Sequence, residues 1–280
     1  MSSRKLIHIC GGGGVAGIGL TRCLKGHFVL QGHDQSTWAE KMMECDKEGV
    51  HAHDADLIIP VPDKAVLKYA EKGGGLGSGI LFLPSYEEVK LCQDKAKTAE
   101  VLGNLAPKTF WVRDTQGAGG KGAQMCSEYL PGRNYSCELV YRAGELLGHF
   151  TKERLSYRVG SVDPLVNGIG SSAVSRCISS SRIVDIAKDA VERVSKHCDT
   201  VPNGVYSADF KENEDGQPKV TEINAGRFLT ASYVYFYSTG YNLPLLMVKK
   251  FFTEPYEIGA YPEGVGVIRQ TDSMPYVGAI

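Results

Sequence analysis

Two carboxylates and an amide, Asp209, Glu222 and Asn224, are the side chains best suited to chemistry in this sequence. Residues 204–211 and 219–223 each favour a strand, and the Asn-Glu-Asp-Gly run between them is typical of a hairpin turn. Glu222 and Asn224 are two apart and so share one face of the hairpin, where Asp209 can join them. Magnesium takes hard oxygen ligands and shares them between carboxylates and phosphates. The trio indicates a magnesium–phosphate site, although such residues, read alone, more often face solvent.

A cation stands directly after this trio. Arg227 is three residues beyond Asn224, where it would lie beside a bound metal and could hold a phosphate or an acyl phosphate. A purely structural strand has no obvious use for such crowding of charge. Arg227 therefore favours the phosphate interpretation.

A glycine-rich stretch, residues 117–122, could surround another anionic group. It follows a predicted strand that carries Arg113, and it contains Lys121, so backbone amides and two cations could close over a triphosphate. Residues 128–132 then read as a strand edge that stops at Pro-Gly, against which an adenine could dock. Taken alone, the first stretch is more often a flexible turn, and the second an ordinary hairpin.

A rival motif stands near the start of the chain. Gly12, Gly14 and Gly17 satisfy GxGxxG between a predicted strand and helix, and Asp34 follows about 20 residues later, as in a dinucleotide site. The motif predicts an NAD(P)-dependent oxidoreductase. It explains nothing after Ser85, so we give it less weight than the phosphate site.

Composition narrows the classes of partner. The formal net charge is −1, which gives no general field for nucleic acid or an anionic membrane, so we expect small-molecule partners. The 8 cysteines include no CxxC pair, and His and Cys do not cluster at zinc-ligand spacing. No stretch resembles a signal peptide or a membrane helix, so we expect a reducing, cytoplasmic setting and, by default for a soluble enzyme, a homodimer.

The elements that would position these residues begin with a parallel α/β pattern. Strands are predicted at residues 6–10, 28–31, 57–60 and 80–83, with a helix at residues 15–25. Ser85 and Glu88 form a capping box, and Gly103 stands where a helix would stop, which predicts a linking helix over residues 85–103.

The rest of the chain reads as a lid and a larger unit. Residues 109–113 and 135–141 favour strands, which we expect to form a small antiparallel lid. An apolar stripe predicts a helix over residues 181–197. The alternating Tyr233, Tyr235 and Tyr237 favour one packed strand face.

In this order the stretches resemble the ATP-grasp superfamily, in particular its carbamoyl-phosphate-synthetase-like ligases and carboxylate–amine ligases such as that of pyrrolysine biosynthesis. Five stretches carry the resemblance: Asp94-Lys95, residues 111–122, residues 128–132, Asp209, and residues 221–227. It implies an α/β fold with an α+β lid, made of an N-terminal Rossmann-like domain (1–84) and an ATP-grasp domain (85–280). The second domain would contain the linking helix (85–103), a lid (about 104–135) and a central domain (136–280).

The resemblance also implies roles for individual residues. Those implied to bind ATP are Lys95, Arg113, Gly119, Gly120 and Lys121 at the phosphates, Glu128, Tyr129 and Leu130 at the adenine, and Asn134 at the ribose. Those implied to hold magnesium, or manganese, are Asp209, Glu222 and Asn224. Arg227 would steady the transferring phosphoryl group. Those implied to contact substrate are Gly12, Gly13, Gly14, Lys152, Arg154 and Arg158, although a solvated basic face is equally consistent with the last three.

The implied activity is ligation of a carboxylate to an amine or ammonia through an acyl phosphate, with release of ADP and phosphate and an amino acid as the first candidate substrate. Two departures matter. Asn134 replaces the usual ribose-binding glutamate, and only residues 124–127 separate the glycine loop from the hinge. These departures leave open a protein that binds ATP without catalysis.

Overall fold

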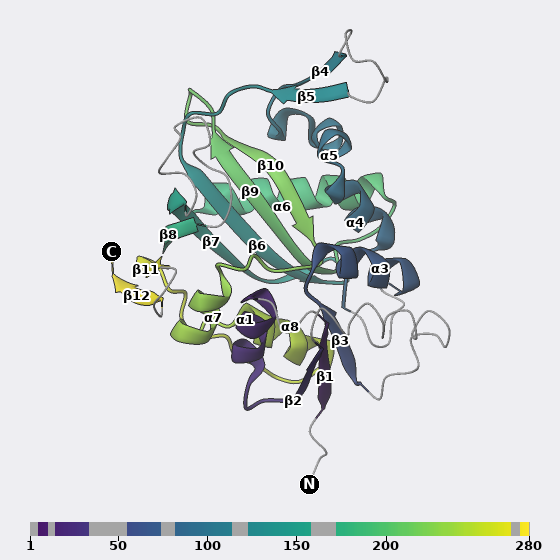
Figure 1. Cartoon of the computed structure of the whole chain (residues 1–280), viewed down its shortest axis with the longest axis vertical. Coiled ribbons are helices and arrows are strands. Elements are labelled where there is room, and N and C mark those ends of the chain that lie inside the picture. Colours follow the sequence, from purple (N-terminus) through teal and green to yellow (C-terminus); the bar gives the residue numbers. More distant parts are fainter. Residues whose placement is uncertain are drawn as a thin grey trace.

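The computed structural model describes residues 5–10, 15–33, 55–73, 82–113, 123–157, 172–269 and 275–279. Its strands form a three-stranded, a two-stranded and a seven-stranded sheet (Figure 1). No helix in these ranges is both long and apolar enough to span a membrane.

The small parallel sheet confirms the predicted N-terminal pattern. β1 (Leu6–Cys10) lies between β2 (Val29–His33) and β3 (Leu57–Pro60), and it pairs with both in parallel. Helices α1 (Val15–Leu24) and α3 (Asp63–Gly73) follow β1 and β3. The fourth strand predicted for residues 80–83 is not confirmed, because its described part, Phe82 and Leu83, is buried but belongs to no strand.

The predicted linking helix is two helices, α4 (Tyr86–Gln93) and α5 (Lys95–Leu102), followed by a short 3₁₀ turn (Gly103–Leu105). The capping box of Ser85 and Glu88 is confirmed. The prediction of a single helix was wrong because Asp94 adopts an extended conformation, and its side chain accepts a hydrogen bond from Lys97 N at 3.1 Å. Aspartate competes with the helix for backbone donors in this way. Lys95 is therefore the first residue of a new helix.

The prediction that residues 109–113 and 135–141 form the lid was also wrong in part. β4 (Thr109–Arg113) pairs with β5 (Ala123–Ser127) in an antiparallel hairpin that stands apart from the large sheet, beside α5 (Figure 1). The other strand assigned to the lid is β6 (Asn134–Arg142), which belongs to the large sheet. Residues 128–132, predicted as a strand edge, lie between β5 and β6 outside any strand.

The large sheet is antiparallel, in the order β10-β9-β6-β7-β8-β11-β12. The strands not yet bounded are β7 (Glu145–Tyr157), β8 (Ser172–Cys177), β9 (Gly204–Glu212), β10 (Pro218–Ala225), β11 (Val265–Ile268) and β12 (Tyr276–Ala279). The predicted hairpin is β9–β10. Helix α6 (Ser181–His197), as predicted, packs with α4 and α5 on what we call the rear face.

We call the small parallel sheet with α1 and α3 the N-terminal unit. The front face of the large sheet packs against this unit through α1, α7 (Tyr233–Thr239) and α8 (Leu243–Phe251). The strand predicted from Tyr233, Tyr235 and Tyr237 is wrong, because these residues form α7, with Tyr233 and Tyr235 buried. Packing against α1 and the sheet outweighs the β preference of aromatic residues here.

Because side chains alternate between the two faces of a strand, β6 has one apolar face and one face that is polar at first and apolar further along. Its rear-facing residues Tyr135, Cys137, Leu139 and Tyr141 lie in the core beneath α6. The opposite side begins with three polar residues, Asn134, Ser136 and Glu138, before the apolar Val140. The polar half of the front face is where the candidate residues gather. The proposed domain boundaries stay a prediction.

Candidate functional site

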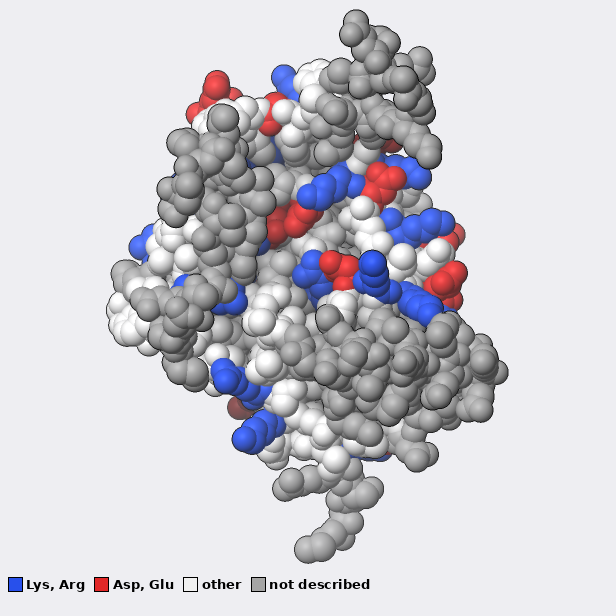
Figure 2. Space-filling model, viewed as in Figure 1, with Lys and Arg blue, Asp and Glu red and all other residues white. Residues whose placement is uncertain are grey.

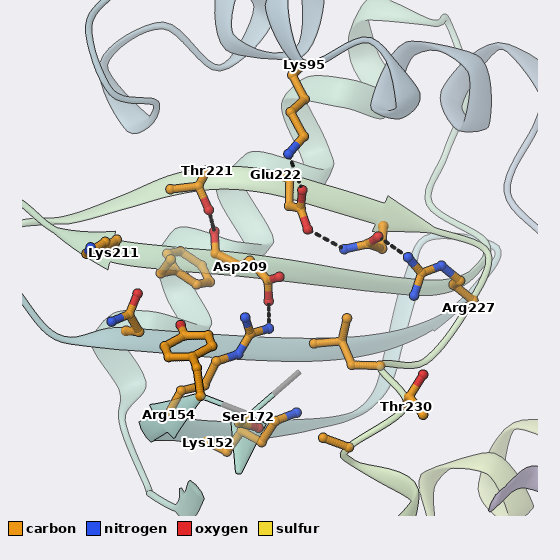
Figure 3. Close-up of a pocket in the computed structure, with 16 residues that line it drawn as sticks. Lys95, Lys152, Arg154, Ser172, Asp209, Lys211, Thr221, Glu222, Arg227 and Thr230 are labelled. Carbon is orange, nitrogen blue, oxygen red and sulfur yellow. Dashed lines mark hydrogen bonds and ion pairs between the residues drawn. The ribbon is translucent and has the colours of Figure 1, made fainter. Parts of the chain in front are cut away.

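A pocket of about 550 Å³ lies over the polar half of the front face. It is lined by residues of β6–β10, by Lys95 of α5, and by the segment 227–231 that follows β10. Figure 2 shows Lys and Arg directly beside Asp and Glu around the middle of this side of the molecule. Figure 3 shows the lining side chains converging from the strands below and from α5 above.

The proposed metal trio meets on neighbouring strands of this pocket. Asp209 of β9 stands directly opposite Glu222 of β10, and Asn224 follows two residues later. A β-bulge between Val220 and Glu222 makes this possible: Val220 and Ile223 both point into the rear core, while Glu222 and Asn224 line the pocket. Without the extra residue, Glu222 would share the face of Val220.

Both carboxylates carry a cation from another element. Lys95 Nζ lies 2.7 Å from Glu222 Oε2, and Arg154 of β7 forms an ion pair with Asp209 (Figure 3). Asn224 Nδ2 donates to Glu222 Oε1 at 3.4 Å, and Arg227 donates to Asn224 Oδ1. The predicted metal ligands and phosphate cations thus neutralise one another.

The two carboxyl groups differ in acidity. Burial raises the pKa of Asp209 above its ordinary value, with Arg154 opposing and Glu222 adding to the shift. Burial acts in the same direction on Glu222, but hydrogen bonding and charge from Lys95 outweigh it and hold the pKa of Glu222 below its ordinary value. The low pKa of Glu222 therefore depends on Lys95, whereas the raised pKa of Asp209 comes from burial, which Arg154 only partly offsets.

A second, buried pair of charged groups lies beside the pocket, and Lys152 of this pair also lines it. Glu138 of β6 and Lys152 of β7 are 0% and 1% exposed. Glu138 Oε1 accepts from Leu229 N at 2.8 Å, and Lys152 Nζ donates to Ser232 Oγ. Burial raises the pKa of Glu138 and lowers that of Lys152, and the charge of each opposes the shift of the other. The pair fixes both ends of the segment 229–232, part of which lines the pocket.

Three residues in or beside the pocket were not predicted from the sequence. Glu138 is one, and its only signal was polarity at every second residue of an otherwise apolar strand. Lys211 of β9 lines the pocket as a further cation, two residues beyond Asp209. Asp63, the first residue of α3, forms an ion pair with Arg227 and had no local signal at all.

The structure brings together many of the predicted residues. Those that line the pocket are Lys95, Asn134, Lys152, Arg154, Asp209, Glu222, Asn224 and Arg227. The predicted hinge residues are not among the described lining. Glu128 pairs with Lys108 through its backbone and its carboxylate, Leu130 is buried, and Tyr129 is 78% exposed beneath Lys211 Nζ, 5.7 Å from its ring centroid.

The other predicted residues lie outside the part of the chain that the structure describes. They are Gly12, Gly13, Gly14, Gly119, Gly120, Lys121 and Arg158. Arg113 lies in β4, but its side chain is outside the described set. Their assignments stay predictions.

The donor set fits a hard divalent cation with phosphate ligands. No three His, Cys, Asp or Glu side chains gather as a complete metal cage within the described ranges. Asp209 and Glu222 supply two carboxylates and Asn224 an amide oxygen, which is the partial set magnesium takes when phosphates complete it. Ser136 Oγ, buried between Asp209 and Lys152 in the sheet register, has no hydrogen-bond partner among the described residues.

Comparisons with known proteins bear on the fold. No family model matches the sequence, and no curated protein matches it significantly. Among solved structures, a protein from Archaeoglobus fulgidus assigned to the ATP-grasp superfamily matches with a TM-score of 0.64 and 17% identity, over 99% of this chain and 100% of the other.

Two further structures match over most of the chain. An L-amino acid ligase from Bacillus licheniformis matches with a TM-score of 0.62 and 10% identity, over 95% of this chain and 80% of its own. An N5-carboxyaminoimidazole ribonucleotide synthetase in complex with ADP matches with a TM-score of 0.64 and 12% identity, over 96% and 82%. The chain therefore has the ATP-grasp fold.

Proposed function

We propose that this chain, with its ATP-grasp fold, is an ATP-dependent ligase that joins a carboxylate to an amine or ammonia and releases ADP and phosphate. One observation carries the proposal: Asp209, Glu222 and Asn224 lie together at a pocket whose other charged lining residues, among those that the structure describes, are cations. Two of the similar structures, an L-amino acid ligase and a synthetase bound to ADP, support it. Among ligases of this fold, the carbamoyl-phosphate-synthetase-like group and the carboxylate–amine ligases are the proposed relatives.

Nucleotide would lie between the hairpin lid and the large sheet. Lys95 and Lys211 would bind its phosphates, joined by Arg113 and the glycine loop at Gly119, Gly120 and Lys121. The hinge at Glu128, Tyr129 and Leu130 would hold the adenine, and Asn134 the ribose. Asn134 is an amide, which bonds hydroxyls less strongly than a carboxylate.

Magnesium would be held by Asp209, Glu222 and Asn224, and it would supply charge neutralisation at the phosphates. Lys95 must then leave Glu222, and Arg154 must leave Asp209. Both cations remain beside the charges they would next stabilise. Exchange of one anion for another keeps the site close to neutral throughout.

The reaction has two group transfers. A carboxylate oxygen of the substrate attacks the γ-phosphorus, the bond to the β–γ bridging oxygen breaks, and ADP leaves with that electron pair. The amine then attacks the carbonyl carbon of the acyl phosphate, loses a proton to solvent, and displaces phosphate. Arg227 would neutralise the transferring phosphoryl group in the first step and the departing phosphate in the second.

Substrate would enter from the side of Lys152 and Arg154, with Arg158 and Gly12–Gly14 as further proposed contacts. The cations there favour an anionic substrate, and an amino acid is the first candidate. We further propose a cytoplasmic enzyme, homodimeric, with small molecules as its partners.

Magnesium-dependent ADP release tests the proposal directly. Purified protein is supplied with ATP and with amino acids, dipeptides, or bicarbonate plus ammonia. We expect ADP release above the substrate-free rate for at least one pair, and none with EDTA. Absence of any stimulation across the set would leave a protein that binds ATP without catalysis.

A thermal-shift comparison separates this proposal from the oxidoreductase alternative. Magnesium-ATP should raise the melting temperature, and NADH should leave it unchanged. Stabilisation by NADH alone would favour the N-terminal GxGxxG motif as the working site.

A further inference from the structure

Arg227 takes its position from two units of the protein. It follows β10 of the large sheet, yet its guanidinium forms a two-point ion pair with Asp63 at the start of α3, 164 residues away in the sequence. Nε donates to one carboxylate oxygen, and Nη2 lies 3.3 Å from the other. A planar guanidinium held at two points by a carboxylate has a fixed orientation, which a single contact does not give.

The backbone beside Arg227 is fitted to the same helix. Gly226 has φ +89°, and a Cβ built on it would lie 2.4 Å from Val66 Cγ1 of α3. Its N–H donates to Val205 O at 2.7 Å. Backbone and side chain of this turn therefore both rest on α3, while Gln93 Nε2 of α4 contacts Asp63 O at 3.4 Å.

Asp63 is also the end of a continuous chain of polar contacts across the top of the pocket. Arg227 donates to Asn224, Asn224 to Glu222, and Glu222 pairs with Lys95 at the start of α5 (Figure 3). The contacts of Arg227 in this chain use Nε and Nη2, which leaves Nη1 as the nitrogen to meet a phosphate oxygen. The chain joins the N-terminal unit to the proposed metal and phosphate centre.

We propose that Asp63 is a positioning residue, through which the N-terminal unit orients Arg227 toward the γ-phosphoryl group. The inference rests on the proposed function, because it assumes that Arg227 meets this group. Without Asp63 the guanidinium would have to be ordered when nucleotide binds, which weakens its contact with the γ-phosphate and leaves contacts with the other phosphates unchanged. Asp63 is 63% exposed as a side chain, so its substitution should not threaten the fold.

The test compares the affinities of magnesium-ADP and magnesium-β,γ-imido-ATP by calorimetry, which needs no turnover. Wild type should prefer the triphosphate analogue, and Asp63→Asn should reduce that preference roughly three- to tenfold without changing ADP affinity. Asp63→Glu, which keeps the charge, should recover at least half of the loss. Asp189→Asn is the control, since Asp189 holds Arg193 by a similar two-point pair at 2.9 Å on α6, away from the pocket.

The outcomes separate the two proposals. A preference that Asp63→Asn leaves unchanged or increases, or that Asp189→Asn reduces equally, overturns the role of Asp63 alone. Wild-type protein that binds neither nucleotide overturns the proposed function and this inference with it. Equal melting temperatures of the variants would show that the loss is not one of folding.

Discussion

Carboxylates on the two faces of the sheet around β9 are held in different ways. On the rear face, Glu88 is 0% exposed and accepts four hydrogen bonds, from Ser85 N, Ser85 Oγ, Ser195 Oγ and Tyr206 O–H, at 2.5–2.8 Å. On the front face, Asp209 and Glu222 are held by the cations Arg154 and Lys95. The same type of group meets neutral, fixed donors on one side and long charged side chains on the other.

The difference indicates separate uses for the two faces. Neutral donors at the N-cap of α4, on α6 and on β9 can only stabilise the carboxylate of Glu88 where it stands. Burial and the charge of Glu88 raise the pKa of Tyr206, so its hydroxyl stays a donor. A lysine or arginine that exchanges its carboxylate for a phosphate keeps its charge compensated. The rear network stabilises packing, whereas the proposed function requires the front pairs to exchange with metal and phosphate.

The largest expected effect comes from the front carboxylates. Asp209→Asn combined with Glu222→Gln removes both charges while keeping shape and hydrogen-bonding oxygens. We expect ADP release to fall at least about 1,000-fold, with the far-UV circular dichroism spectrum unchanged. Protection by magnesium-ATP against thermal unfolding should disappear as well.

A matched control lies on the same hairpin. Glu214 and Asp215 are exposed in the β9–β10 turn, and Glu214→Gln with Asp215→Asn makes the same chemical changes. This variant should turn over like wild type. If the front variant kept a tenth of the activity, the front carboxylates would have a structural role, like Glu88, and not a role in the reaction.

The rear network should respond in stability instead. Glu88→Ala leaves four donors without their acceptor, two of them buried and the two of Ser85 partly buried, which should cost about 3 kcal/mol or more. In a chain of this size the melting temperature should fall by roughly 6–12 °C in a thermal melt. Glu87→Ala, an exposed neighbour in the first turn of α4, should cost under about 1 kcal/mol. Below its melting temperature the Glu88 variant should keep its affinity for ATP. If its binding free energy fell by more than its free energy of unfolding, the contrast between the two faces would be wrong.

The two faces were not equally predictable from the sequence. The rear face follows from local signals: the capping box of Ser85 and Glu88 and the apolar stripe of α6 are visible in a few adjacent residues and are confirmed. The front trio was also foreseen, since Glu222 and Asn224 are two apart. The bulge that turns Glu222 away from the face of Val220 was not, because it exists only in the pairing of β9 with β10.

The contacts that were not predicted from the sequence depend on long-range packing. Asp63 meets Arg227 only once α3 is docked on the turn after β10, and Glu138 becomes part of a charge pair only when β6 and β7 are covered by residues 229–232. The break at Asp94 reflects competition between a side chain and a helix, which the apolar spacing of residues 85–103 conceals. Local periodicity identifies elements, whereas partners across 80 or more residues come from the assembled fold.

Lys95 tests whether the front cations are exchangeable. Its ion pair is solvent-exposed, with side chains 58% and 31% exposed, so Lys95→Met should change stability by less than about 1 kcal/mol. Affinity for ATP should fall about tenfold, since a charge-assisted contact with phosphate is lost. Magnesium binding without nucleotide, measured by calorimetry, should instead strengthen, because Glu222 loses its competitor. Lys97→Met on the same helix should do neither, as Lys97 pairs with Asp94 at 3.6 Å. Weaker binding of magnesium alone would show that Lys95 supports the carboxylate as a fixed partner does.

The smallest effect concerns the turn that carries Arg227, which packs closely against α3. Gly226→Ala has two costs, which are a side chain at positive φ and a clash of the added Cβ with Val66. Gly216→Ala, in the hairpin turn at φ +69°, has only the first cost, because nothing lies within 4 Å of its added Cβ. Subtracting the second change in unfolding free energy from the first removes the cost of the backbone conformation and leaves that of displacing α3, which we expect to be about 1 kcal/mol. Because that displacement also moves Asp63, the Gly226 variant should lose part of the preference for β,γ-imido-ATP over ADP, and the Gly216 variant should keep it. Equal costs in urea unfolding, with equal preferences, would mean that the turn carrying Arg227 moves as freely as the cations around it.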